Sequence, residues 1–195
     1  MHMIIEKNGL VEYHPSLFSL SQSLEFFTLL EKEIAWEADV LTIFGKKIIT
    51  KRKVAWYGDA AFEYIYSNSS KIALPWTHTL QTIKTHLENY TGEQFNSCLL
   101  NIYHNGSESM GWHSDDEAMM KKHAPIASIS LGAQRTFVFQ HKISKEKQSI
   151  ELENGSLLLM KDATQDYWKH HLPIRKRIKT PRINLTFRQF DITST

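Results

Sequence analysis

The chain has 195 residues, of which 42% are hydrophobic, 11% aromatic and 23% charged, and its formal net charge at pH 7 is +2. This composition excludes a disordered protein, and the length supports one hydrophobic core, so we expect a single domain spanning residues 1–195. The only cysteine, Cys98, excludes an internal disulfide and is expected to be a buried thiol. No stretch approaches the roughly 20 apolar residues that span a bilayer. We therefore expect a monomer with no membrane partner, cytoplasmic in a bacterium or nuclear in a eukaryote.

Two segments carry apolar residues at three- and four-residue spacing, which predicts amphipathic helices. The first follows a serine-rich start and contains Leu24, Phe27, Leu30 and Ile34. The second follows Pro75, has Thr77 as a candidate N-cap, and contains Leu80, Ile83, Leu87 and Tyr90.

The rest of the chain predicts strands punctuated by glycine and asparagine, over residues 53–57, 62–66, 96–103, 126–131, 136–141, 148–153, 156–160, 167–171 and 182–190. Two early helices followed by many strands favour an α+β domain whose later half is a sandwich or a barrel.

Basic residues gather in two places, at Lys46, Lys47, Lys51, Arg52 and Lys53, and at Arg175, Lys176, Arg177, Lys179 and Arg182. Such clusters suit phosphate backbones, but taken alone each is more often typical of a solvated loop. They indicate nucleic acid only if a site elsewhere does so as well.

A candidate metal site begins at His113-Ser114-Asp115, where an imidazole and a carboxylate two residues apart point to one side of a strand. His170 and His171 follow about 57 residues later. Two histidines and one carboxylate form the facial triad of non-haem iron(II) enzymes, although zinc accepts the same ligands. The spacing leaves open which of the two histidines binds.

Residues 182–188 alternate between polar and apolar without a break. One face of this strand carries Arg182, Asn184, Thr186 and Arg188, a donor-rich stripe suited to a dicarboxylate because guanidinium groups hold carboxylates at two points. Asn101 and Tyr103 repeat the pattern on a smaller scale. A metal triad beside such a stripe is typical of a 2-oxoglutarate site.

These motifs resemble the AlkB-type nucleic-acid demethylases, most closely the branch that prefers duplex DNA. The match runs from about residue 41 to 190 and is strongest at 101–103, 113–117, 125–133 and 181–188. The resemblance implies a double-stranded β-helix (jelly-roll) core at about 96–190, N-terminal helices, and a nucleotide-recognition lid of hairpins at about 40–70.

The resemblance also implies roles for individual residues. The cofactors would be Fe(II), O₂ and the co-substrate 2-oxoglutarate, with iron bound by His113, Asp115 and His170. His171 stands where the family often has a small residue, and it could compete for the metal. The 2-oxoglutarate ligands would be Arg182 at the distal carboxylate, Arg188 at the carboxylate nearer the metal, and Asn101, Tyr103 and Asn184 as hydrogen-bonding support.

The implied reaction is the oxidative demethylation of bases such as 1-methyladenine and 3-methylcytosine by a ferryl oxidant, releasing formaldehyde, succinate and CO₂. The implied partner is DNA, preferably double-stranded with single strands tolerated, and the damaged base must flip out of the duplex to be reached. Substrate contacts would come from Tyr64 and Tyr66 by stacking, from Glu117 at the exocyclic amine, from Arg52 toward the complementary strand, and from Phe44 in the hydrophobic finger 43–46.

Two other functions are compatible with the iron and 2-oxoglutarate residues. One is an oxygenase that acts on RNA, a protein or a small molecule. The other is a catalytically silent nucleic-acid-binding module, which the full set of ligands disfavours.

Overall fold

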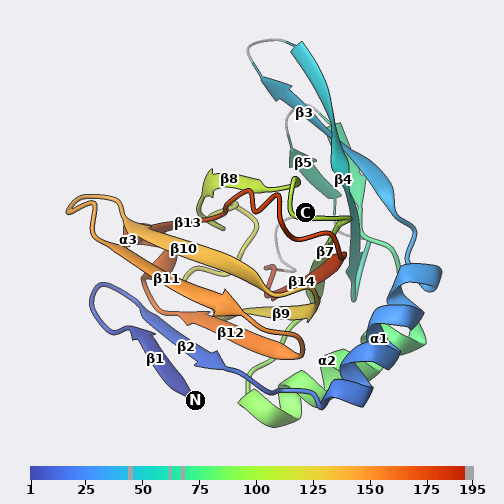
Figure 1. Cartoon of the computed structure of the whole chain (residues 1–195), viewed down its shortest axis with the longest axis horizontal. Coiled ribbons are helices and arrows are strands. Elements are labelled where there is room, and N and C mark those ends of the chain that lie inside the picture. Colours follow the sequence, from blue (N-terminus) through green and yellow to red (C-terminus); the bar gives the residue numbers. More distant parts are fainter. Residues whose placement is uncertain (44–45, 62, 67–68, 192–195) are drawn as a thin grey trace.

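Two facing β-sheets form the centre of the computed structural model, with two helices packed beside the larger one (Figure 1). The structure describes residues 1–43, 46–61, 63–66 and 69–191, and side chains within residues 1–40, 49–61 and 72–191. The helices are α1 (Leu20–Glu33), α2 (His78–Thr91) and the short α3 (Thr164–Tyr167). None of the described helices is long and apolar enough to cross a membrane.

Fourteen strands are described, in three sheets. The larger sheet has the order β1 (His2–Ile5), β2 (Leu10–His14), β12 (Ser156–Lys161), β9 (Ile126–Gly132), β14 (Arg182–Arg188), β7 (Ser97–Tyr103), β4 (Lys46–Gly58) and β3 (Glu37–Ile43). The smaller sheet has the order β11 (Lys147–Leu152), β10 (Arg135–His141), β13 (Trp168–Leu172) and β8 (Met110–His113). A separate hairpin joins β5 (Glu63–Tyr66) and β6 (Ser69–Ile72). The expected jelly-roll core is confirmed.

Strand β14 lies in the middle of the larger sheet, between β9 and β7, and it separates two environments. Its apolar residues Ile183, Leu185 and Phe187 are fully buried in the main core. Leu30 of α1 and Leu87 of α2 belong to the same core. The helices therefore cover one face of the sheet, and the polar side chains of β14 face the smaller sheet.

Local signals start and end the two long helices. Ser19 caps α1 in a reciprocal capping box with Gln22, and Thr77 caps α2 by accepting a hydrogen bond from the backbone N–H of Leu80. Helix α2 ends at Gly92, whose φ of 75° is the left-handed conformation that glycine adopts at little cost. The predicted cap at Thr77 is confirmed.

The buried face of α1 differs from the predicted apolar stripe. Leu24 is 65% exposed, whereas Ser23 is fully buried. The close approach of the turn at Gly155 explains this, because a Cβ added there would lie 2.4 Å from the Ser23 hydroxyl oxygen. Tyr90 of α2 is likewise half exposed and hydrogen-bonds to His14.

Several elements are not predicted individually from the sequence: β1, β2, β3, β6, β8 and α3, although β3 and β6 overlap the lid of hairpins expected at about 40–70. Most are strands of four or five residues, too short to show a clear alternation. Strands β3 and β4 pair along their length and extend from the body of the molecule at the top of Figure 1.

Candidate active site

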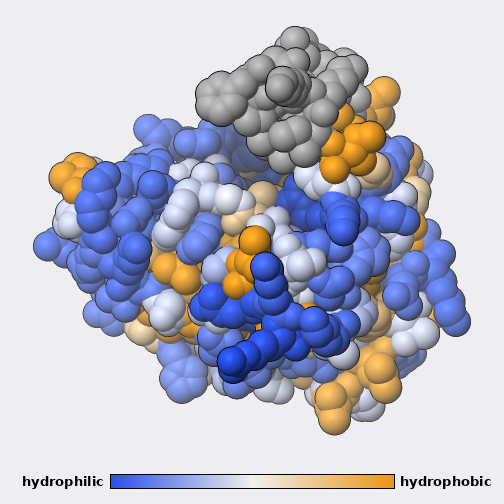
Figure 2. Space-filling model, turned by 45° about the horizontal axis from the view of Figure 1, so that its top comes forward, coloured by the Kyte–Doolittle hydropathy of each residue, from blue (hydrophilic) through white to orange (hydrophobic). Residues whose placement is uncertain are grey.

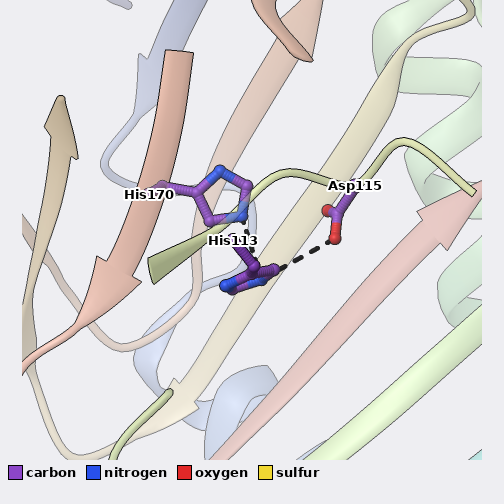
Figure 3. A group of neighbouring side chains, drawn as sticks. All are labelled: His113, Asp115 and His170. Carbon is purple, nitrogen blue, oxygen red and sulfur yellow. Dashed lines mark hydrogen bonds and ion pairs between the residues drawn. The ribbon is translucent and has the colours of Figure 1, made fainter. Parts of the chain in front are cut away.

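Three predicted ligands meet between the two sheets (Figure 3). His113 ends β8, Asp115 follows in the next loop, and His170 lies on β13 directly opposite His113. The Nε2 atoms of the two histidines are 3.1 Å apart, and the His113 Nε2 is 3.8 Å from the Asp115 carboxylate. Ligands at metal–donor distances of about 2.1 Å lie about 3 Å apart when they are adjacent on a metal. The three side chains therefore fit one metal ion with little movement.

The surroundings keep these groups in metal-binding states. The His113 Nδ1 lies 2.8 Å from the carbonyl oxygen of Gly111, so a proton held there leaves Nε2 free for a metal. Burial lowers the pKa of His170 to about 3, and the imidazole is therefore neutral. Burial is the largest single influence and acts to raise the pKa of Asp115, but the charge and hydrogen bond of Arg188, together with His170 and His113, lower that pKa below its usual range.

His171 points away from the metal site. Neighbouring residues on a strand face opposite sides, and the His171 ring stacks on Trp112 with the ring centroids 3.8 Å apart. His170 instead packs against Phe137 and Phe139 beside the site. The structure thus agrees with His170 as the third ligand and removes His171 as a competitor.

We expect His171→Ala to leave the affinity for a divalent metal unchanged within about twofold, because the ring contacts no ligand atom. His170→Ala should lower that affinity by on the order of 100-fold or more, since it removes a ligand. Calorimetric titration of the metal-free chain with Mn²⁺ measures both. Weak Mn²⁺ binding by the His171 variant, with normal Mn²⁺ binding by the His170 variant, would make His171 the third metal ligand instead of His170.

A narrow cavity of about 50 Å³ extends from the triad toward the interior, with Arg182 in its lining. Arg182 is 2% exposed, donates to the Ser130 hydroxyl at 2.9 Å, and lies 5.6 Å from the centre of the Tyr103 ring. No ion pair joins it to an acidic side chain among the described residues. Burial lowers its pKa to about 10, so it is still a cation at neutral pH. A buried cation without a counter-ion is suited to an anionic ligand.

The other residues of the predicted stripe line the same cavity. Asn101 is 4% exposed, and its side chain has no hydrogen-bond partner among the described residues. Asn184 donates to the Ser128 hydroxyl at 2.9 Å and to the carbonyl of Ile129 at 3.0 Å. The predicted set of Asn101, Tyr103, Arg182, Asn184 and Arg188 is therefore gathered in one cavity beside the triad.

Arg188 connects the metal site to the outer pocket. Its guanidinium donates to Asp115 at 2.7 Å and to Glu117 at 3.1 Å. Asp115 and Arg188 are each 6% exposed. This pair fixes the carboxylate ligand and places the Glu117 side chain beside it.

A second, wider cavity of about 360 Å³ opens from the triad on the other side, and Glu117 and Trp56 line it. The residues common to both cavities are Leu99, Asn101, Met110, His113, Asp115 and Arg188. Two of the three metal ligands, His113 and Asp115, thus lie where an inner chamber meets an outer one, and His170 lines the inner chamber.

Arg52 lies in the wall of this outer cavity instead of on the surface. It is 5% exposed, is ion-paired with Asp39, and donates to the Met110 sulfur at 3.0 Å. A surface contact to DNA would require this pair to open. The side chains of Tyr64 and Tyr66 on β5 and all of Phe44 are outside the described residues, so their predicted roles remain predictions.

Sequence reasoning missed two parts of the site. Ser128 and Ser130 alternate with apolar residues on β9, which could have placed them on the polar face. Arg135 gave no such signal: it is 1% exposed, bonds to the carbonyls of Glu108 and Pro173, and lies 5.8 Å from the Tyr103 ring. Its positive charge lies close to Arg182 and adds to the anion preference of the inner cavity.

Comparisons with known proteins agree with this geometry. The family model of the 2OG-Fe(II) oxygenase superfamily matches residues 11–188. DNA oxidative demethylase ALKBH2 of Homo sapiens is 39% identical over 200 residues, covering 97% of this chain and 77% of that protein. Alpha-ketoglutarate-dependent dioxygenase alkB homolog 3 of Homo sapiens is 41% identical over 147 residues, covering 70% of this chain and 51% of that protein.

A solved structure titled "The structure of OsALKBH1" superposes with a TM-score of 0.68 at 16% identity, covering 92% of this chain and 97% of that one, which shows a shared fold. The family match extends over nearly the whole chain and includes the triad between the sheets. The chain therefore belongs to the 2OG-Fe(II) oxygenase superfamily, among its AlkB-type members, and is an iron(II)- and 2-oxoglutarate-dependent dioxygenase.

Proposed function

We propose that this dioxygenase reverses alkylation damage in DNA by oxidative demethylation of N-methylated bases such as 1-methyladenine and 3-methylcytosine. The observation that carries the proposal is the pair of chambers that meet at the triad. The inner one presents the buried guanidinium of Arg182, which has no acidic partner among the described residues, and the outer one is large enough for a base and has the Glu117 carboxylate in its wall. Relatives named as DNA oxidative demethylases support DNA as the substrate.

In this proposal Arg182 holds the distal carboxylate of 2-oxoglutarate, and Arg188 lies near the other carboxylate. Asn101, Tyr103 and Asn184 complete the polar lining. Bound iron(II), with O₂ and 2-oxoglutarate, supplies the oxidation of the N-methyl carbon, which leaves as formaldehyde while 2-oxoglutarate becomes succinate and CO₂. The protein positions the two substrates and excludes water from the buried inner chamber.

A damaged base must leave the duplex to enter the outer chamber, and an unpaired lesion does so at lower cost. Methylation at the pairing edge of adenine or cytosine makes the ring cationic, so the Glu117 carboxylate in the chamber wall favours the lesion over the normal base. Tyr64 and Tyr66 on β5 would stack on the flipped base.

The paired strands β3 and β4 and the hairpin of β5 and β6 would form the nucleotide-recognition lid of this single domain. Exposed Lys51 and Lys53 on β4 would contact phosphates, and Arg52 would reach the complementary strand after release from Asp39. We propose duplex DNA as the preferred substrate, a monomer as the active form, and the cytoplasm of a bacterial cell as its location.

The first experiment is demethylation of a 1-methyladenine oligonucleotide, single-stranded and duplex, with iron(II), ascorbate and 2-oxoglutarate. Mass spectrometry should show loss of one methyl group only when 2-oxoglutarate is present. His170→Ala should show none. Turnover of 2-oxoglutarate without repair of either form would instead indicate RNA, a protein or a small molecule as the substrate, and absence of all turnover would indicate a silent binding module.

Phe44→Ala should lower the rate on duplex DNA by about tenfold and the rate on single strands by much less. The reason is that an apolar wedge at this position would fill the gap that a flipped base leaves in the stack, a contribution of about 1.4 kcal/mol for a tenfold effect, and a single strand has no such gap to fill. Lys51→Ala is the matched control, since loss of a phosphate contact weakens both substrates. Equal losses on both substrates for Phe44→Ala would remove the finger from the proposal.

A further inference from the structure

A cluster of three side chains lies on the outside of the smaller sheet, at the rim of the outer chamber. Trp112 is 38% exposed and lines that chamber. The ring of His171 stacks on its indole at 3.8 Å between centroids, and the Lys169 ammonium lies 5.2 Å from the indole centre. None of the three has a role in the site described above.

The metal site itself determines where this cluster lies. His113 and His170 must face inward to bind the metal, so their neighbours Trp112 and His171 face outward on adjacent strands. Lys169 shares the outward face of β13 with His171. Each of these two strands therefore carries a metal ligand next to a residue of the cluster, His113 beside Trp112 and His170 beside His171. The stacked His171 ring restricts the orientation of the indole.

The surroundings of the cluster are basic and polar. Lys147 and Arg175 lie near His171 and add positive charge. The face of the molecule in Figure 2 is mostly hydrophilic with small, separate hydrophobic areas. An isolated aromatic among cations differs from a protein interface, which needs a contiguous apolar centre. Nucleic acid matches both the aromatic ring and the cations around it, since aromatic rings stack on bases and lysine binds phosphate.

We propose that Trp112 stacks on the base next to the flipped lesion on the same strand, with Lys169 contacting a phosphate beside it. This role rests on the proposed function. The Lys169 side chain is long and flexible, so its ammonium can move from the indole to a phosphate when a base arrives. The damaged strand would then be bound at the opening of the outer chamber both by the lid (β3 to β6) and by this cluster.

The test uses single-stranded 1-methyladenine oligonucleotides with a normal base, or an abasic spacer, at the 5′ or the 3′ neighbouring position. Trp112→Leu should raise KM for the normal oligonucleotide about 5- to 150-fold, the range expected for loss of one base stack, with the effect mainly on KM. Trp112→Phe should keep most of the affinity. For the wild type, the spacer on one side should raise KM by a similar factor.

The decisive result is the combination, because the same spacer should cost Trp112→Leu almost nothing. Tyr167→Ala is the matched control, since Tyr167 is 37% exposed, stacks on a histidine and lines neither chamber. A spacer penalty of equal size in the wild type and Trp112→Leu, or a normal KM for Trp112→Leu, would overturn this role while leaving the demethylase intact. Absence of demethylation by the wild type on every oligonucleotide would overturn the proposed function and this role together.

Discussion

Replacing Arg182 with methionine should strongly weaken the binding of 2-oxoglutarate and, at the same time, stabilise the ligand-free chain. The guanidinium is fully buried and has no acidic partner among the described side chains, and the nearby Arg135 repels it. Loss of a two-point carboxylate contact should raise KM for 2-oxoglutarate by about 100-fold or more. Removing an uncompensated buried charge should increase the free energy of unfolding by about 1 kcal/mol or more.

Urea denaturation of the two metal-free chains measures the stability, and initial rates at increasing 2-oxoglutarate measure KM. Added 2-oxoglutarate with Mn²⁺ should raise the melting temperature of the wild type and not that of the variant, because only a ligand that binds the folded state stabilises it. Arg182→Lys is the matched control, since it keeps the charge and loses the planar fork. A methionine variant that is less stable and has a normal KM would make Arg182 a structural partner of Ser130 instead.

The arrangement of the inner chamber could be predicted because alternation is a property of the strand itself. Residues 182–188 have apolar side chains on one face, and that face is forced into the core under the helices. Because side chains alternate along a strand, Arg182 and Arg188 must then lie on the opposite face of the strand, and this holds for any order of the strands in the sheet. The same reasoning applied to 170 and 171 shows that only one histidine can face the metal, although it does not say which one.

Other parts of the site depend on contacts between distant segments, which a single sequence does not show. Asp39 lies 13 residues before Arg52 and meets it only because β3 and β4 pair with a bulge between Ala38 and Val40. Arg135 reaches carbonyl groups 27 and 38 residues away in loops of irregular shape. The exposure of Leu24 likewise depends on the turn at Gly155, which is distant from α1 in the sequence but lies against it in the fold.

Replacing Arg188 with methionine should have the largest effect on stability, because it leaves a buried carboxylate without its main counter-ion. Asp115 is 6% exposed and accepts from Arg188 at 2.7 Å, and Glu117 shares the same guanidinium. Breaking a buried pair from one side typically costs about 3–5 kcal/mol. We expect a loss of this size in the free energy of unfolding of the metal-free chain, measured by urea denaturation, and a fall in kcat/KM of about 100-fold or more.

Metal should recover part of that loss, and this distinguishes a misplaced charge from a damaged core. A divalent ion bound by His113, Asp115 and His170 supplies the positive charge that Arg188 provided, so Mn²⁺ should raise the melting temperature of Arg188→Met by more than that of the wild type. Glu117→Gln is the matched control: its amide oxygen can still accept from Arg188, and its stability should change by no more than about 1 kcal/mol. Equal Mn²⁺ shifts in all three chains would show that Arg188 acts through packing, and not through the charge of Asp115.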